Sequence, residues 1–161
     1  MSNNNIDEVF EMVEFNQLEN LKKIANESNV NLFVNEFGQN LLHEAIAQNS
    51  REVVHYLLYC NIDVNKEDKE GKTPLHYSAV HNNIEFSKLL LEHQSIQKDK
   101  KDRYGNNAMW VAVFYADGYY DVVKLFKKHN LDSNCKNNAN RSALDFARQI
   151  EDEELVKILL E

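Results

Sequence analysis

One eight-residue pattern recurs four times in this chain at nearly constant spacing, and this period restricts the possible fold more than any other feature. Each copy starts with Gly or Asn, passes through a small or capping residue to an apolar residue, and has a small residue three positions later. The first residues of successive copies lie 33, 34 and 35 positions apart. A fixed period of this length is typical of stacked supersecondary units. The copies are GQNLLHEA at 38–45, GKTPLHYS at 71–78, GNNAMWVA at 105–112 and NRSALDFA at 140–147.

A second pattern follows each copy and predicts a second helix. Its apolar residues fall at helical intervals, for example Val53, Val54, Leu57 and Leu58 in the first copy. Each repeat is therefore expected to hold two helices and a turn, a unit that must stack on a neighbour to bury its apolar face. The stretches are SREVVHYLLYCNIDVN, NIEFSKLLLEHQSIQK, YYDVVKLFKKHNLDSN and DEELVKILLE.

The only proline of the chain, Pro74, lies at the start of an expected helix. Proline has no N–H and a fixed φ, so it fits the first helical turn, where that donor has no partner in any case. Thr73 before it is a suitable N-cap. Glycines 38, 71 and 105 and Asn140 open the four copies, as expected for residues that tolerate a left-handed turn.

The period and the Thr-Pro-Leu-His stretch at 73–76 together resemble the ankyrin repeat, whose signature is T-P-L-H-x-A with a period of 33 residues. The resemblance covers about residues 5–161. It implies an all-α ankyrin-repeat solenoid of five helix–turn–helix units, two of them caps, in one domain over 1–161. The expected units are an amino-terminal cap at 5–35, repeats at 36–67, 68–101 and 102–136, and a carboxy-terminal cap repeat at 137–161.

The same resemblance assigns a structural role to two histidines. It implies that His43 and His76 bridge the backbone of neighbouring turns. Two histidines one repeat apart could also suggest a metal pair, but Trp110 and Asp145 occupy the corresponding later positions, so no series of ligands continues. In the fourth unit, about two extra residues are expected between the helices, near Ala116 and Asp117.

Charge and composition limit the partners that this chain is expected to have. Its net charge is −8, and its one local run of bases, at 98–103, is interrupted by Asp99 and Asp102. A nucleic-acid partner is therefore not expected, whereas a protein partner with basic patches is. The two cysteines form no CxxC pair, the amino terminus shows no secretory signal pattern, and no apolar run approaches a membrane span. The expected location is cytoplasmic.

Motifs of catalysis are not found in the sequence. There is no GxGxxG, P-loop, GxSxG or HExxH, and no Cys–His spacing matches a closed zinc site. We expect no enzymatic activity, no metal and no cofactor. The resemblance instead implies a protein-binding surface on the concave side of the stack, built from turn tips and inner helices.

Mapped onto this sequence, the family pattern predicts a set of partner-binding residues. Tyr104, Tyr115 and Arg103 are the leading candidates, because Tyr and Arg are frequent interface anchors. Asn106 and Val111 are expected on the same surface. Trp110 and Phe114 either fill core space or belong to the interface, and the sequence leaves both readings open. The predicted binding residues are Phe37, Lys69, Lys72, Tyr77, His81, Arg103, Tyr104, Phe114, Tyr115 and Arg141.

The expected function is that of a non-catalytic module, monomeric alone, that inhibits or scaffolds a protein partner. The stretches GNNAMWVAVF and NRSALDFA look like those of compact bacterial ankyrin proteins, some of which resemble immunity proteins that neutralise a cognate toxin. The alternative is a regulatory or host-directed ankyrin protein that binds a eukaryotic protein.

Overall fold

The computed structural model describes residues 3–161 as ten α-helices and one 3-10 helix, with no strand in that range. Two isolated β-bridges, between Val34 and Asn40 and between Lys101 and Asn107, are the only extended pairings there. The predicted all-α solenoid is confirmed. The helices are α1 (Asn3–Glu14), α2 (Leu18–Ile24), η1 (Val30–Leu32), α3 (Leu41–Ala47), α4 (Arg51–Tyr59), α5 (Pro74–Val80), α6 (Ile84–Leu91), α7 (Ala108–Phe114), α8 (Asp121–Lys128), α9 (Ala143–Gln149) and α10 (Glu153–Leu160).

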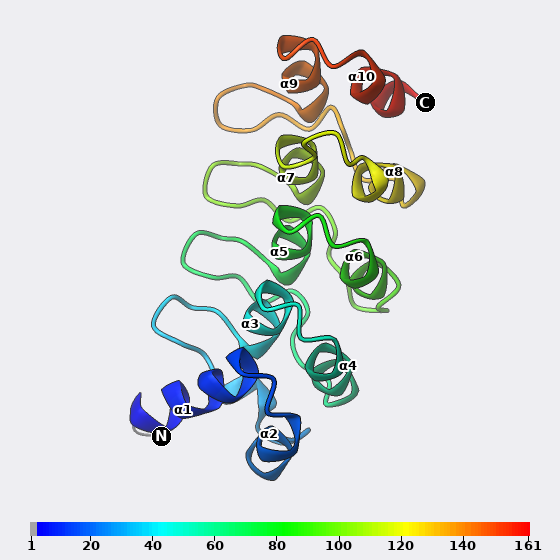
Figure 1. Ribbon diagram of the computed structural model, residues 1–161. Helices are drawn as coiled ribbons and strands as arrows, with labels where there is room; N and C mark the ends of the chain where they lie inside the picture. The colour runs from blue at the N-terminus through cyan, green and yellow to red at the C-terminus, as the bar shows by residue number, and fades with distance from the viewer. Residues whose placement is uncertain (1–2) are drawn as a thin grey trace.

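The odd-numbered helices stack in one column and the even-numbered helices in a second column beside it (Figure 1). Each odd helix packs on the next odd helix and on the even helix of its own pair. Loops before α3, α5, α7 and α9 project to one side of the first column (Figure 1). We call these loops, at 34–40, 67–73, 101–107 and 136–142, the fingers, and we call the surface made by the fingers and the odd-numbered helices the finger face.

The core lies between the two columns and continues along the whole stack. The predicted apolar stripe of α4 is buried at Val53, Val54 and Leu57, and that of α6 at Phe86 and Leu90. Each such side chain contributes about 1.5–3 kcal/mol through its removal from water. Because the stripes are shared between neighbouring pairs, no pair buries its apolar face alone.

The turn chemistry confirms the predicted helix starts. Pro74 is the first residue of α5, and Thr73 is its N-cap with extended backbone. Asn107 caps α7 by accepting a hydrogen bond from the Trp110 N–H at 2.9 Å. Glycine is required at finger position 71, where φ is +76° and a Cβ would lie 3.1 Å from the Arg103 nitrogen of the next finger.

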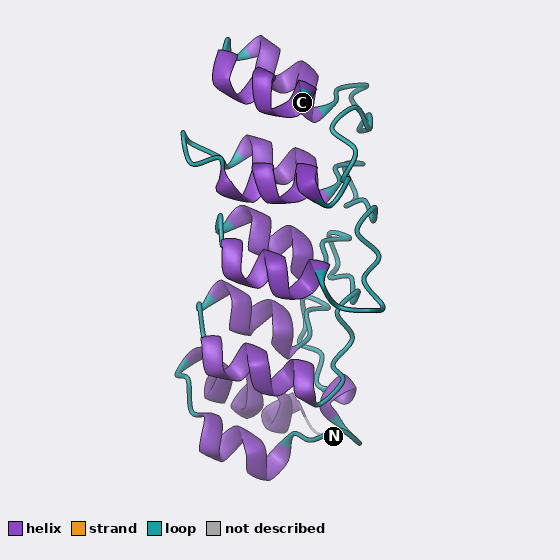
Figure 2. Ribbon diagram, turned by 90° about the vertical axis from the view of Figure 1, so that its right-hand side faces the viewer, coloured by secondary structure: helices purple, strands orange, loops and turns teal. Residues whose placement is uncertain are grey.

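The connection between α7 and α8 is longer than its counterparts. It spans 115–120, whereas the connections at 48–50, 81–83 and 150–152 have three residues. The expected gain of about two residues is thus a gain of three. Asp117 and Gly118 both have positive φ, at 43° and 82°, so the loop turns sharply, and it projects from the edge of the stack beyond the ends of its own helices (Figure 2).

Across the described range, every helix is too short or too polar to span a lipid bilayer.

Candidate functional site

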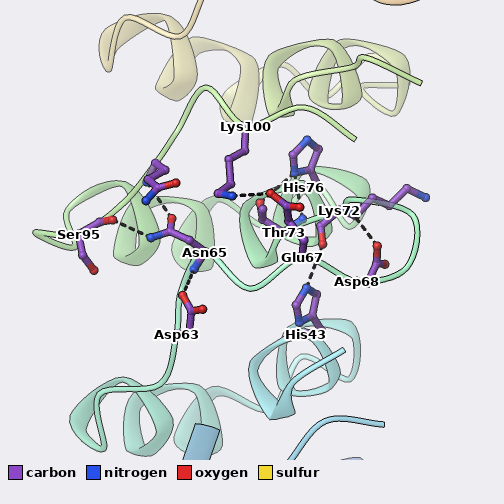
Figure 3. A network of polar contacts seen from close by, with 11 residues as sticks. His43, Asp63, Asn65, Glu67, Asp68, Lys72, Thr73, His76, Ser95 and Lys100 are labelled. Carbon is purple, nitrogen blue, oxygen red and sulfur yellow. Dashed lines mark hydrogen bonds and ion pairs between the residues drawn. The ribbon is translucent and has the colours of Figure 1, made fainter. Parts of the chain in front are cut away.

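Two buried histidines fasten the bases of successive fingers to one another. The His43 Nε2 lies 3.1 Å from the Lys72 carbonyl oxygen, and the His76 Nε2 lies 3.2 Å from that of Asn106 (Figure 3 shows the first pair). A carbonyl can only accept, so each Nε2 carries the proton. These contacts confirm that both histidines bridge to the next turn.

The opposite ring nitrogen of each histidine completes the arrangement. Nδ1 of His43 accepts from the Asn40 backbone N–H, and Nδ1 of His76 accepts from that of Thr73, both at 3.2 Å. Both rings are therefore neutral. Burial lowers the pKa of His43 to about 4 and also lowers the pKa of His76, because desolvation disfavours the charged form.

A second series of polar contacts connects the links that lead into the fingers. The Asn65 side chain donates to the Ser95 carbonyl at 2.7 Å and accepts from the Gln97 N–H at 2.8 Å. Close by, Lys100 forms an ion pair with Glu67 (Figure 3). One repeat earlier, Asn31 makes the equivalent pair of bonds to 61 and 63. These contacts hold the fingers at a constant spacing.

The finger tips are also joined edge to edge through their backbones. Such bonds fix the tip of each finger relative to the next without using a side chain. They run from Lys69 N to Phe37 O at 2.9 Å, from Arg103 N to Glu70 O at 2.7 Å, and from Asn138 N to Tyr104 O at 2.9 Å.

Two aromatic rings stand exposed on these fixed tips. The Phe37 residue is 59% exposed and Tyr104 is 49% exposed. The Arg103 guanidinium lies 4.7 Å from the centre of the Tyr104 ring and pairs with the Glu70 carboxylate at 2.5 Å. The ring and the cation are therefore already in contact before any partner arrives.

Tyr77 has a more structural position than the other predicted residues. It is half-buried, and its hydroxyl accepts from Gln39 at 2.5 Å and donates to Asp68 at 2.9 Å. Its ring meets that of His43 edge-on at 4.9 Å. Burial is the main cause that raises the pKa of Tyr77 to about 12. Tyr77 thus ties two fingers together.

The remaining predicted residues are distributed along the finger face. Lys69, His81 and Arg141 are exposed, and Lys72 is half-buried. The expectation for two accompanying residues was wrong, because Asn106 and Val111 are only 8% and 4% exposed. Val111 joins the core of α7, and the Asn106 N–H donates to the Asp102 carboxylate at 2.9 Å.

An aromatic cluster covers the column between α7 and α9. Trp110 stacks on Phe114 with ring centres 5.3 Å apart, and Phe146 lies 5.7 Å from the first ring and 5.4 Å from the second. Trp110 is half-buried against the core, with its Nε1 enclosed and without a hydrogen-bond partner in the described residues. Phe114 and Tyr115 are 48% and 46% exposed. Trp110 therefore fills core space, whereas Phe114 is exposed beside it.

Phe146 was not predicted from the sequence. Phe146 follows Asp145 as Tyr77 follows His76, so the two residues occupy equivalent positions in their repeats. The alignment that predicted Tyr77 could therefore have predicted Phe146. Among the described residues, no group of three or more His, Cys, Asp or Glu side chains has a metal-binding arrangement. Cys60 and Cys135 are both free thiols.

The sequence was compared with protein families and with known proteins, and both comparisons found matches. The family described as ankyrin repeats (3 copies) matches residues 9–102 and 42–137. Alpha-latrotoxin-Lg1a of Latrodectus geometricus is 26% identical over 124 residues, which are 76% of this chain and 9% of that protein.

Two further relatives show the same partial coverage. Rabankyrin-5 of Mus musculus is 29% identical over 123 residues, or 76% of this chain and 10% of that protein. The transient receptor potential cation channel subfamily A member 1 homolog of Caenorhabditis elegans is 30% identical over 101 residues, or 62% of this chain and 8% of that protein. The chain spans about a tenth of the length of these relatives.

Proposed function

The chain belongs to the ankyrin repeat family, and on that basis we propose that it binds a protein partner through its finger face without catalysing a reaction. The family is generally a non-catalytic module of protein–protein interaction. The proposal assigns the binding to the predicted residues on the fingers, on α5 and α7, and directly after these two helices.

One observation supports this proposal above the others: exposed aromatic rings lie on cross-bonded finger tips. Phe37 and Tyr104 carry the two rings, and the bonds between neighbouring fingers hold the backbone at both positions in place. A ring that is ordered before binding loses little conformational entropy when a partner covers it. Aromatic and arginine side chains in such positions are the usual anchors of an interface.

The charged residues of the finger face have a different proposed role. Lys69, Lys72 and Arg141 are basic positions on a chain whose net charge is −8. Charges at the rim of an interface change specificity and association rate more than affinity. We therefore assign to them the selection of the partner and to the aromatic residues most of the binding free energy.

The proposed mode of action is occlusion. A partner held against the finger face loses access to the surface that is covered, so the chain acts as a stoichiometric inhibitor, of which an immunity protein is one form. This form predicts that a purified partner with an assayable activity is fully inhibited near one equivalent. Partial or no inhibition of a saturated partner would favour a scaffolding role instead.

The binding proposal is tested by affinity capture from lysate of the cells that make the protein, with quantitative mass spectrometry. The double variant Phe37→Ala/Tyr104→Ala should lose at least about 90% of the captured partner, equivalent to tenfold or more in affinity. Tyr59→Ala is the matched control, because Tyr59 is 73% exposed at the end of α4, away from the finger face. Equal capture by all three proteins would contradict the proposal.

A further inference from the structure

A groove lies at one edge of the stack, where α7 and α9 end. It has a volume of about 570 Å³. Buried Val113, Ala116 and Leu155 line it together with residues that are exposed to solvent. The exposed or half-buried lining residues are Phe114, Tyr115, Asp117, Gly118, Phe146, Ile150 and Asp152.

The connection between α7 and α8, which is longer than its counterparts in the other helix pairs, lines the groove with residues 115–118. This loop is held at several points. Ala116 is buried, the Tyr119 carbonyl accepts from the Asn82 side chain at 3.1 Å, and the Tyr120 hydroxyl donates to Asp152 at 2.7 Å. The wall that the loop provides is therefore in place without a ligand.

Three large apolar side chains are exposed along this groove. Phe114, Tyr115 and Ile150 are each 46–48% exposed and line the same groove. Single exposed apolar residues are common, but a contiguous exposed apolar patch marks a site of interaction. Phe146, on α9, is half-buried, and its ring lies 5.4 Å from the ring of Phe114. It extends this apolar surface.

The charges at the groove have one sign. Asp117 and Asp152 are among its lining residues, and Glu151 is the exposed neighbour of Asp152. No Lys or Arg lines the groove, and none of these three carboxylates forms a salt bridge with the residues that the structure describes. The Asp152 carboxylate also accepts hydrogen bonds within the chain, from the Leu155 N–H at 2.9 Å and from the Tyr120 hydroxyl at 2.7 Å. An acidic occupant would meet like charge, whereas a basic occupant would find complementary charge.

We propose that this groove receives a segment of the protein partner in which one or two large apolar side chains are flanked by Lys or Arg. The inference rests on the proposed function and narrows it, because it states the chemistry of the segment that binds and the place where it binds. The apolar side chains lie against Phe114, Phe146 and Ile150, and the basic side chains face Asp117 and Asp152.

Trp110 gives this proposal a local optical signal. It is the only tryptophan of the chain and stacks directly on Phe114. A library of random twelve-residue peptides displayed on phage is selected against the wild-type protein, and the enriched peptides are synthesised without Trp. We expect enrichment of Leu, Ile or Phe within two positions of Lys or Arg, depletion of Asp and Glu, and a saturable change of Trp110 emission on titration.

Matched variants locate the binding. Ile150→Ser should weaken a selected peptide about tenfold through the loss of apolar contact. Ile84→Ser is the control, because Ile84 is also 48% exposed but lies at the start of α6, outside this groove, and it should change affinity less than about twofold. Asp117→Asn keeps a residue that tolerates positive φ, and should weaken basic peptides about threefold.

Several results would overturn the inference. They are the failure to enrich any peptide, enrichment of acidic peptides, equal binding by the wild type and Ile150→Ser, or a concentration-dependent dimer that Ile150→Ser abolishes. Peptides weakened by Phe37→Ala/Tyr104→Ala but not by Ile150→Ser would reject the groove while leaving the finger-face function intact. Loss of capture in the lysate experiment is a separate result and tests that function alone.

Discussion

At the scale of single residues, two buried histidines each connect one finger to the next through a hydrogen bond. Each neutral ring donates from Nε2 to the next finger and accepts at Nδ1 from its own. Protonation would place a positive charge in a buried site, where desolvation disfavours it. His43 and His76 therefore make the fold sensitive to acid.

The first prediction concerns the dependence of stability on pH. His43 has a folded pKa of about 4, below the value of 6.5 for an unfolded chain, so the unfolded state binds more protons between these pH values. Stability is complete above about pH 6.5 and falls as the pH drops toward 4, by about 3 kcal/mol for this residue. Urea unfolding at pH 7 and pH 5 measures the effect.

The variant His43→Gln provides the control for that experiment. It should be less stable than the wild type at pH 7, because the bridge to Lys72 is lost, but its stability should change less between pH 7 and pH 5. Unchanged pH dependence in the variant would assign the acid sensitivity to other groups.

The second prediction compares a core residue with a surface residue of the same region. Leu75 is 1% exposed, so Leu75→Ala should cost about 2–5 kcal/mol of unfolding free energy. Tyr104→Ala should cost about 0.5 kcal/mol or less, because its ring packs on no core residue. Thermal and urea unfolding of both variants would show the difference; comparable losses would mean that Tyr104 is part of the fold.

At the scale of elements, glycine at a finger turn has two reasons to be there. Gly105 has a φ of +79°, and a Cβ on it would lie 2.5 Å from the Asn138 side-chain oxygen and 2.8 Å from the Asn138 nitrogen. Gly118, in the α7–α8 connection, has a similar φ of +82°, but a Cβ on it would have no other heavy atom within 4 Å. A comparison of alanine substitutions at Gly105 and Gly118 therefore separates the cost of backbone strain from the cost of close packing against the next finger.

The third prediction follows from that pair. Gly118→Ala should cost about 1–2 kcal/mol, the usual penalty for a left-handed alanine. Gly105→Ala should cost more, because the next finger must also move. Urea unfolding measures both, and Gly105→Ala should in addition disturb amide NMR signals around Asn138. Equal costs would show that the neighbouring finger yields freely.

The helices and their order could be predicted because apolar spacing and turn residues recur with the period. The error at Val111 arose within an element, since one residue along a helix changes its direction by about 100°. The length of the α7–α8 loop was underestimated because the spacing of the repeats, 35 against 33, shows only two of the three inserted residues, since α8 is one residue shorter than α4. The groove could not be predicted, because it depends on how that loop folds back on α9.

At the scale of the whole molecule, the main contacts of each helix pair are with its neighbours in the stack, and the period accounts for this architecture. The period contains no information about the partner, because the tip residues vary while the turns repeat. What distinguishes one stack from another is which side chains stand on the finger face and what net charge surrounds them.

The fourth prediction uses that net charge, −8. A partner with basic patches is attracted over long distance, so association should slow by about tenfold between 50 and 500 mM NaCl while dissociation changes little. Biolayer interferometry with the captured partner separates the two rates. An association rate that does not respond to salt would contradict a basic partner.

The central claim is that a protein partner covers the finger face, and hydrogen–deuterium exchange of the complex tests it most directly. We predict slower exchange in the fingers at 67–73 and 101–107 and at the ends of α7 and α9, with the even-numbered helices unchanged. Protection confined to α4, α6 and α8, with the fingers exchanging as in the free protein, would contradict the account.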